Sequence, residues 1–162
     1  NAYVIPTTKW RKALKRAIQR GVKIRIMTNS TQTSDVMLAQ AAYRNARGRL
    51  IKMGIEVWEY QGPKTLHTKS TVIDDSISIV SSYNLVSFAE RWSTEVAVWV
   101  ADTTLAKQHK LLMEENLKSA IRIDKHNKQV VSEIPDAKKL TCKKKMSLFF
   151  SRYTFAWVMR LL

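Results

Sequence analysis

The spacing of apolar residues changes abruptly at Gly21, and this change constrains the fold more than any other feature. Before it, apolar residues recur at helical spacing: Trp10, Ala13, Leu14, Ala17 and Ile18. This spacing predicts an amphipathic helix with a basic outer face. After Gly21, Val22, Ile24 and Ile26 alternate with Lys23 and Arg25, a pattern typical of a strand. A helix leading into a strand predicts layers of helices against a sheet.

The rest of the chain repeats this alternation. We expect strands at 2–5, 22–30, 55–60, 65–73, 76–81 and 94–100, with helices at 9–20, 35–53 and 102–121. The residues Asp74 and Asp75 form a good turn pair between two of these strands. Strands separated by helices favour parallel pairing. The sequence therefore predicts an α/β fold with a mixed, mostly parallel sheet flanked by helices.

The chain changes character after residue 123. We expect one domain at 1–123, a basic polar linker at 124–145 and an apolar segment at 146–162. The last segment has 17 residues and contains Arg152 and Arg160, whereas a spanning helix needs about 20 mainly apolar residues. We expect it to lie in a membrane interface or to pack on the domain.

The charge of the chain and its few cysteines and histidines limit the classes of partner, disulfide and metal site that can be expected. The net charge of +15, from 28 Lys and Arg against 13 Asp and Glu, predicts an anionic partner such as nucleic acid or acidic lipid. Cys142 is the only cysteine, so no intrachain disulfide can form. The chain has three histidines, none near another in sequence, so we expect no zinc site and no cofactor.

The window from His67 to Asn84 carries the candidate chemistry. It reads His67-x-Lys69, then Asp74, then Ser81-Ser82-x-Asn84. The imidazole of His67 can attack phosphorus and form a phosphohistidine, and the Lys69 ammonium can bind a phosphoryl oxygen. On a strand, residues two apart lie on the same face, so His67 and Lys69 are expected to project together.

Other polar residues complete the expected site. The hydroxyl of Ser82 and the amide of Asn84 are short donors for the remaining phosphate oxygens. A carboxylate would hold the imidazole tautomer, and Glu95 and Asp74 are the two candidates. We therefore expect His67, Lys69, Asp74 and Glu95 as catalytic residues, with Lys69, Ser82 and Asn84 binding phosphate.

This pattern resembles the phospholipase D superfamily, whose motif is His-x-Lys, four residues, Asp, six residues, Gly-Ser-x-Asn. The departure is Ser81 in place of the glycine, where a Cβ could crowd a phosphate. Residues 20–30 and 54–60 resemble the C-terminal half of bacterial cardiolipin synthases, and the likeness covers roughly residues 2–120.

The resemblance implies a site built from two such motifs, with the second histidine acting as acid and then base. This chain has one motif, and His109 and His126 lie in no comparable context. The second half could come from a second copy of the chain. It could also come from a preceding N-terminal region, which the strand-like start without Met favours.

Two substrates and one inactive alternative remain open. The cardiolipin synthase-like flanks and the lysines before the apolar segment favour an anionic phospholipid and a peripheral place on a membrane, at the cytoplasmic face in a bacterium. The charge also fits a single-motif nuclease that acts on nucleic acid as a homodimer. Ser81 is the one support for a catalytically idle anion-binding module.

Overall fold

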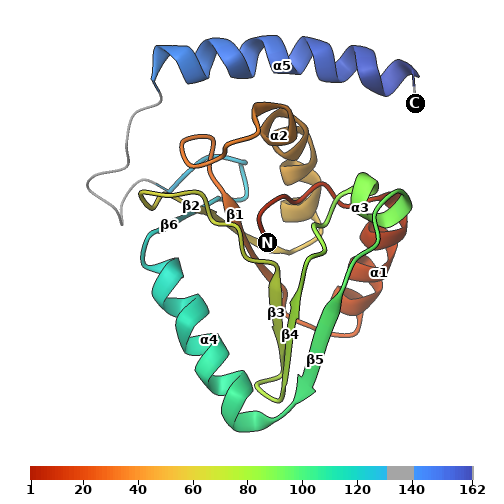
Figure 1. Ribbon diagram of the computed structural model, residues 1–162, viewed down its shortest axis with the longest axis vertical. Helices are drawn as coiled ribbons and strands as arrows, with labels where there is room; N and C mark the ends of the chain where they lie inside the picture. Colours follow the sequence, from red (N-terminus) through yellow and green to blue (C-terminus); the bar gives the residue numbers. More distant parts are fainter. Residues whose placement is uncertain (131–140, 162) are drawn as a thin grey trace.

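The computed structural model of the chain describes residues 1–130 and 141–161 (Figure 1). Five helices are formed by the described residues: α1 (Thr8–Gln19), α2 (Met37–Lys52), α3 (Ser87–Arg91), α4 (Thr103–Leu117) and α5 (Cys142–Leu161). The described strands are β1 (Arg25–Asn29), β2 (Glu56–Tyr60), β3 (Ser70–Ile73), β4 (Ile77–Ser81), β5 (Ala97–Ala101) and β6 (Ala120–Arg122). Helices and strands alternate as expected, and the α/β class is confirmed.

The strands form two three-stranded sheets rather than one mostly parallel sheet. The orders are β1-β2-β6 and β3-β4-β5, and of the four pairings between described strands only β1–β2 is parallel. The expectation of mostly parallel pairing is therefore wrong. Asp74 and Asp75 both adopt left-handed φ angles, 49° and 53°, in the three-residue turn 74–76 that makes β3 and β4 antiparallel.

Three boundaries differ from the sequence prediction. Residues 2–5 form a single bridge, between Val4 and Leu85, instead of a strand. The stretch before Ser70 has no regular structure, so His67 lies in a loop. The last helix of the domain ends at Leu117, and Ile121 lies in β6, which pairs with β2.

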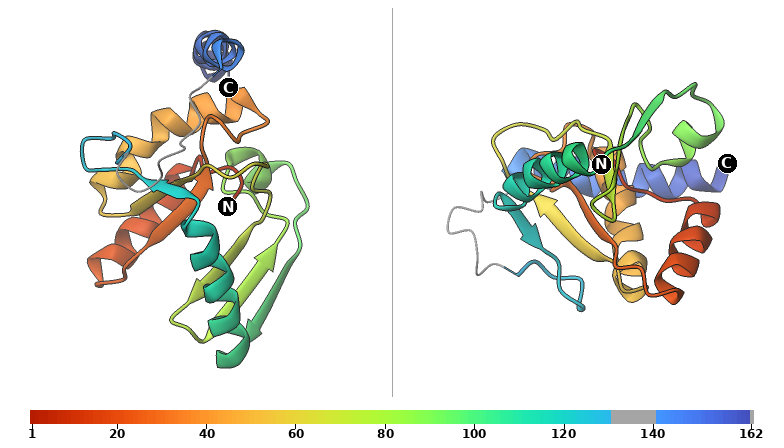
Figure 2. Two further views of the ribbon diagram at one scale, coloured as in Figure 1. Left: turned by 90° about the vertical axis from the view of Figure 1, so that its left-hand side faces the viewer. Right: turned by 90° about the horizontal axis from the view of Figure 1, so that it is seen from below.

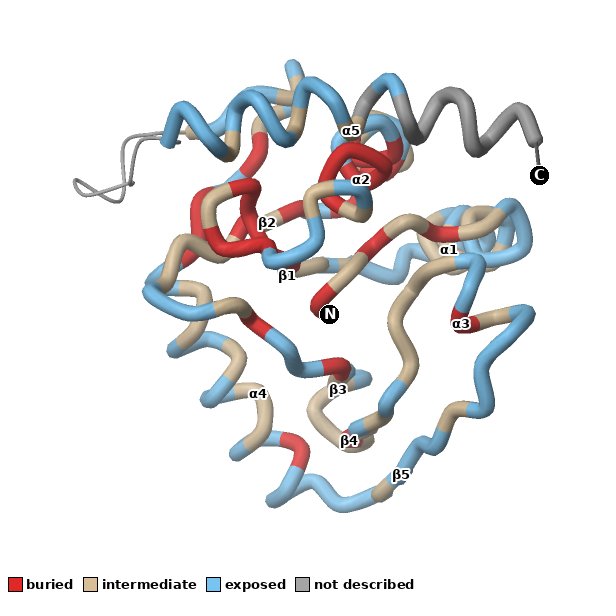
Figure 3. Tube along the Cα trace, turned by 45° about the horizontal axis from the view of Figure 1, so that its top comes forward, coloured by how far each residue is buried: buried red, intermediate tan, exposed pale blue. Residues whose placement is uncertain are grey.

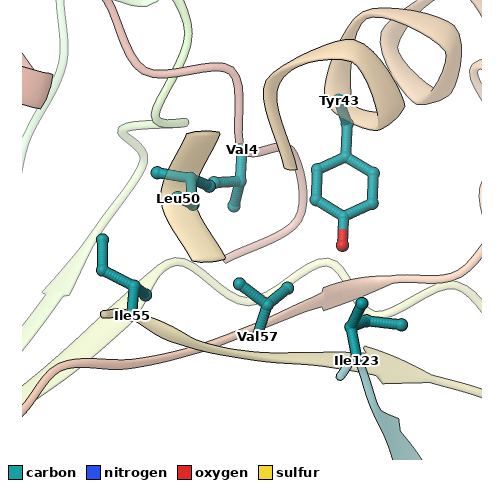
Figure 4. Close-up of a cluster of buried hydrophobic side chains, with 6 residues drawn as sticks. All are labelled: Val4, Tyr43, Leu50, Ile55, Val57 and Ile123. Carbon is teal, nitrogen blue, oxygen red and sulfur yellow. The ribbon is translucent and has the colours of Figure 1, made fainter. Parts of the chain in front are cut away.

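The core lies between α2 and the β1-β2-β6 sheet (Figure 4). Its fully buried apolar side chains are Val4, Tyr43, Leu50, Ile55, Val57 and Ile123. Burial is concentrated in this half, whereas β5 is mostly exposed along its length (Figure 3). The β3-β4-β5 sheet is therefore less covered than the β1-β2-β6 sheet.

A buried ion pair ties this core to the segment after β6. Arg47 of α2 pairs with Glu59 of β2, and their side chains are 8% and 2% exposed. Arg47 also donates to the side chain and carbonyl of Asn127, at 2.7 and 2.8 Å. Residues 124–130 are thus part of the folded domain, where the sequence predicted a linker. The linker residues 131–140 lie outside the described residues.

The helix α5 lies across α2, on the side of the molecule away from α4 (Figures 1 and 2). It begins at Cys142, four residues before the predicted apolar segment. Lys144 fixes its first turn by donating to the backbone carbonyls of Gln32 and Ser34. Among the described residues, no helix combines the length and apolar character needed to cross a membrane.

Candidate functional site

The loop that carries His67 is held by Asn29 at the end of β1. The Asn29 amide nitrogen donates to the carbonyl of Leu66 at 2.8 Å, and its oxygen accepts from the Leu66 N–H at 2.8 Å. The same amide nitrogen donates to the carbonyl of Ala2 at 3.1 Å, and Asn29 is 1% exposed. This side chain replaces the backbone pairing that a strand would provide, and it fixes the residue before His67.

His67 is exposed and its ring meets one aromatic neighbour. The Tyr3 ring lies edge-on to it, with the ring centroids 6.3 Å apart and the planes at 80°. The Tyr3 hydroxyl donates to the Asp35 carboxylate at 2.6 Å. Burial, together with the hydrogen bond and charge of Asp35, raises the pKa of Tyr3 to about 12. Tyr3 is therefore neutral, and its ring is held in one orientation beside the accessible imidazole.

Lys69, two residues after His67, is only 8% exposed. Its ammonium donates to the backbone carbonyl of His67 at 3.0 Å. Burial lowers the pKa of Lys69, while the charges of Glu95 and Asp35 oppose that shift. Held on the His67 carbonyl, the Lys69 ammonium can bind an anionic oxygen as a point charge.

Ser81, the last residue of β4, and Ser82, which follows it, connect this loop to the start of β5. The Ser81 N–H donates to the Lys69 carbonyl at 2.9 Å, so β4 lies directly beside the motif loop. The Ser82 hydroxyl donates to Glu95 and accepts from the Val96 N–H at 3.0 Å. Glu95 therefore orients Ser82. Within the described residues, neither ring nitrogen of His67 has a hydrogen-bond partner.

Asn84 lies three positions beyond the end of β4 in irregular chain, so its placement does not come from a strand. Its amide oxygen is buried without a hydrogen-bond partner among the described residues. A buried amide oxygen without a partner is costly, and such groups often mark a place that a ligand or water completes.

Asp74 is not brought to this group. It lies in the β3–β4 turn at the far end of β3, exposed to solvent. Asp74 lies five positions after Lys69, about 16 Å of extended chain at the usual rise per residue. We therefore correct its predicted role: its position serves the left-handed turn rather than the imidazole.

Two further residues at the site escape a motif search. Tyr3 and Asp35 lie 32 positions apart and are joined by a hydrogen bond between their side chains. Asn29 could have been found from sequence, because a polar residue at the carboxyl end of a parallel strand commonly faces a ligand crevice. No group of three or more His, Cys, Asp and Glu suited to a metal occurs in the part of the chain that the structure describes.

The assembled residues can bind and attack a phosphate group. One accessible imidazole, one buried ammonium, a hydroxyl and an amide come from two segments joined by the Ser81–Lys69 hydrogen bond. Residues 1–117 match the family described as the PLD-like domain of cardiolipin synthase.

The chain belongs to this phospholipase D-like family.

Individual relatives agree with the family assignment. Cardiolipin synthase C of Escherichia coli K12 is 27% identical over 124 residues, which are 66% of this chain and 26% of that protein. The curated relatives are much longer, since the chain spans 29% of one from Helicobacter pylori and 24% of one from Bacillus subtilis.

Solved structures share the fold of this phospholipase D-like chain. Nuc of Salmonella typhimurium, a phospholipase D family member, superposes with a TM-score of 0.57 at 21% identity, covering 75% of this chain and 77% of Nuc. Phosphatidylserine synthase of Haemophilus influenzae gives 0.68 at 16% identity, covering all of this chain and 40% of that protein.

Proposed function

We propose that the chain is the nucleophile-bearing half of a phosphodiester-cleaving or phosphatidyl-transferring enzyme. The observation that carries the proposal is the accessible imidazole of His67, together with the Lys69 ammonium held on the His67 backbone carbonyl, in a family of phospholipase D-like domains. An accessible nucleophile beside a fixed cation is what attack on an anionic phosphodiester requires.

In the proposed first step, a ring nitrogen of His67 attacks phosphorus. A P–N bond forms, the P–O bond to the leaving alkoxide breaks, and the alkoxide takes a proton from a general acid. Lys69 neutralises one nonbridging oxygen and the Asn84 amide N–H donates to the other. The Ser82 hydroxyl also donates to the phosphate after it turns away from Glu95. Water or an alcohol then attacks phosphorus, breaks the P–N bond and releases His67.

The general acid belongs to a second motif-bearing half in this proposal. His109 bonds to Ser78 on β4, and His126 lies in the loop after β6, so neither faces His67. A homodimer partner or another region of a longer polypeptide would supply the missing histidine. We expect the chain held as a monomer to be inactive on substrates whose leaving group needs a proton.

A glycerophospholipid is the substrate that we propose, with the chain peripheral to a membrane. Among the side chains of α5 that the structure describes, the exposed large ones recur at helical spacing: Met146, Phe149, Phe150 and Tyr153. The exposed Lys143 and Lys145 lie beside this stripe. An apolar face flanked by lysines suits an anionic bilayer interface.

A paired assay tests the proposal. Phosphatidylglycerol vesicles and single-stranded DNA are given separately to the wild-type protein at high concentration, to His67→Ala and to the matched loop variant His126→Ala. We expect lipid products from the wild type and from His126→Ala, and none from His67→Ala. DNA cleavage without any lipid product would favour the homodimeric nuclease instead.

A further inference from the structure

A groove beside the candidate site is not used by the mechanism above. It has a volume of about 690 Å³ and lies between the first turns of α5 and the two loops at 32–35 and 63–65. Its charged lining residues are Asp35, Lys64, Lys143 and Lys144. Three lysines against one carboxylate give it a positive balance.

The groove is adjacent to His67 through two contacts. Thr65, which lines the groove, precedes His67 by two residues, about 7 Å of extended chain. Asp35 also lines the groove and accepts the hydrogen bond of Tyr3, whose ring edge meets the His67 ring. A molecule in the groove would therefore lie one side chain away from the nucleophile.

The lining residues have distinct tasks. Lys144 is occupied by the carbonyls of Gln32 and Ser34, so it fixes α5 against the loop. Lys64 and Lys143 are exposed and come from opposite walls. The Gln32 amide oxygen is buried without a hydrogen-bond partner among the described residues.

These groups match a phosphorylated polyol. Two ammonium groups suit the phosphate, and an amide oxygen with the Asp35 carboxylate can accept from hydroxyl groups. We propose that the groove is a second phosphate subsite, which takes the phosphorylated polyol headgroup of a second glycerophospholipid. This inference rests on the proposed function and assigns the binding site of the acceptor phospholipid.

Titration of glycerol 3-phosphate into the isotope-labelled full chain tests the proposal, with amide NMR shifts as the readout. All variants carry His67→Ala, so binding is measured without turnover and independently of the proposed chemistry. The test variant is Lys64→Ala with Lys143→Ala. The matched control is Lys145→Ala, which removes an exposed lysine from the same helix outside the groove.

We expect shifts around residues 32–35 and 64–65, and about tenfold or greater weakening in the test variant, since charge-assisted hydrogen bonds are lost. The control should bind as the parent does. Equal weakening in both, or no weakening, would overturn the subsite.

Competition identifies the source of the phosphate. Phosphatidylglycerol vesicles should displace glycerol 3-phosphate, whereas phosphatidylcholine vesicles should not. Inorganic phosphate should bind more weakly than glycerol 3-phosphate. Displacement by inorganic phosphate or single-stranded DNA, but not by the anionic vesicles, would contradict the lipid headgroup.

Discussion

Lys69 is a cation at only 8% exposure, and its burial shapes both stability and chemistry. Burial lowers its pKa from the usual 10.5. Between the lowered pKa and 10.5, the folded chain binds fewer protons than the unfolded chain. The free energy of unfolding should therefore rise as pH increases through this window.

Lys69→Met separates these two effects. At neutral pH we expect the variant to unfold no more easily than the wild type, and its stability should lack the alkaline rise. Turnover should fall by about 10²–10³, the usual loss when one group that binds the reacting oxygens is removed. Thermal unfolding across pH and initial rates measure the two effects. A large loss of stability at neutral pH would show that Lys69 is mainly structural.

Asn29 illustrates a residue whose site role is indirect. Asn29→Leu leaves the Leu66 N–H and carbonyl and the Ala2 carbonyl without their partner. We expect a loss of about 2–4 kcal/mol in the free energy of unfolding, since several buried polar groups become unsatisfied. Urea unfolding measures it. The exposed Asn45→Leu on α2 is the control, with an expected change of about 0.5 kcal/mol or less.

The motif residues could be found from sequence because their spacing is short. His67, Lys69 and Ser82 lie within 16 positions, and the Ser81–Lys69 hydrogen bond brings their segments together. Tyr3 and Asp35 could not be found, because no local pattern records a contact between distant loops. Asp74 fits the spacing yet serves a turn, since the spacing does not specify which end of a strand faces the site.

At the scale of elements, local periodicity predicted most helices and strands but not how the strands pair. The starts of two helices are fixed locally: Thr7 and Asp102 accept from backbone N–H groups in the first turns of α1 and α4. The strand β6 was merged with α4, because Leu117 and Ile121 continue a helical spacing. Its true partner, β2, lies some 60 positions earlier in the chain.

The buried pair of Arg47 and Glu59 joins α2, β2 and the loop after β6. Arg47→Met leaves the Glu59 carboxylate buried without its cation, which should cost about 3–5 kcal/mol of unfolding free energy. Arg25→Ala is the matched control, since the Arg25–Glu56 pair joins β1 and β2 with side chains 51% and 44% exposed. Its cost should be about 1 kcal/mol or less. Similar losses in the two variants would argue against a structural role for the buried pair.

At the scale of the whole molecule, α5 presents two different faces. Lys144, Leu148 and Ser151 are partly buried toward the domain. The stripe formed by Met146, Phe149, Phe150 and Tyr153 faces outward. The sequence left interfacial and packed placements open for this segment. The helix packs on α2, and the large side chains described on its opposite face, from Met146 to Tyr153, are exposed.

Phe149→Ser with Phe150→Ser tests the outer face as the membrane contact. We expect 10- to 100-fold weaker binding to phosphatidylglycerol vesicles, because the apolar area available for burial is reduced. Phe88→Ser, which alters a similarly exposed phenylalanine on α3, should bind as the wild type does. Vesicle sedimentation measures this. Unchanged binding by the α5 variant would show that the membrane contact lies elsewhere or does not exist.

The central claim is that this chain supplies the nucleophile, whichever partner supplies the acid. A phosphodiester with a 4-nitrophenolate leaving group tests it directly, since that group departs without a proton and the second half is not needed. We predict a burst of nitrophenolate approaching one equivalent per chain, with the phosphoryl adduct located on His67 by mass spectrometry. His67→Ala should show neither, and His126→Ala should show both. No adduct on His67, or an equal burst from His67→Ala, would contradict the account.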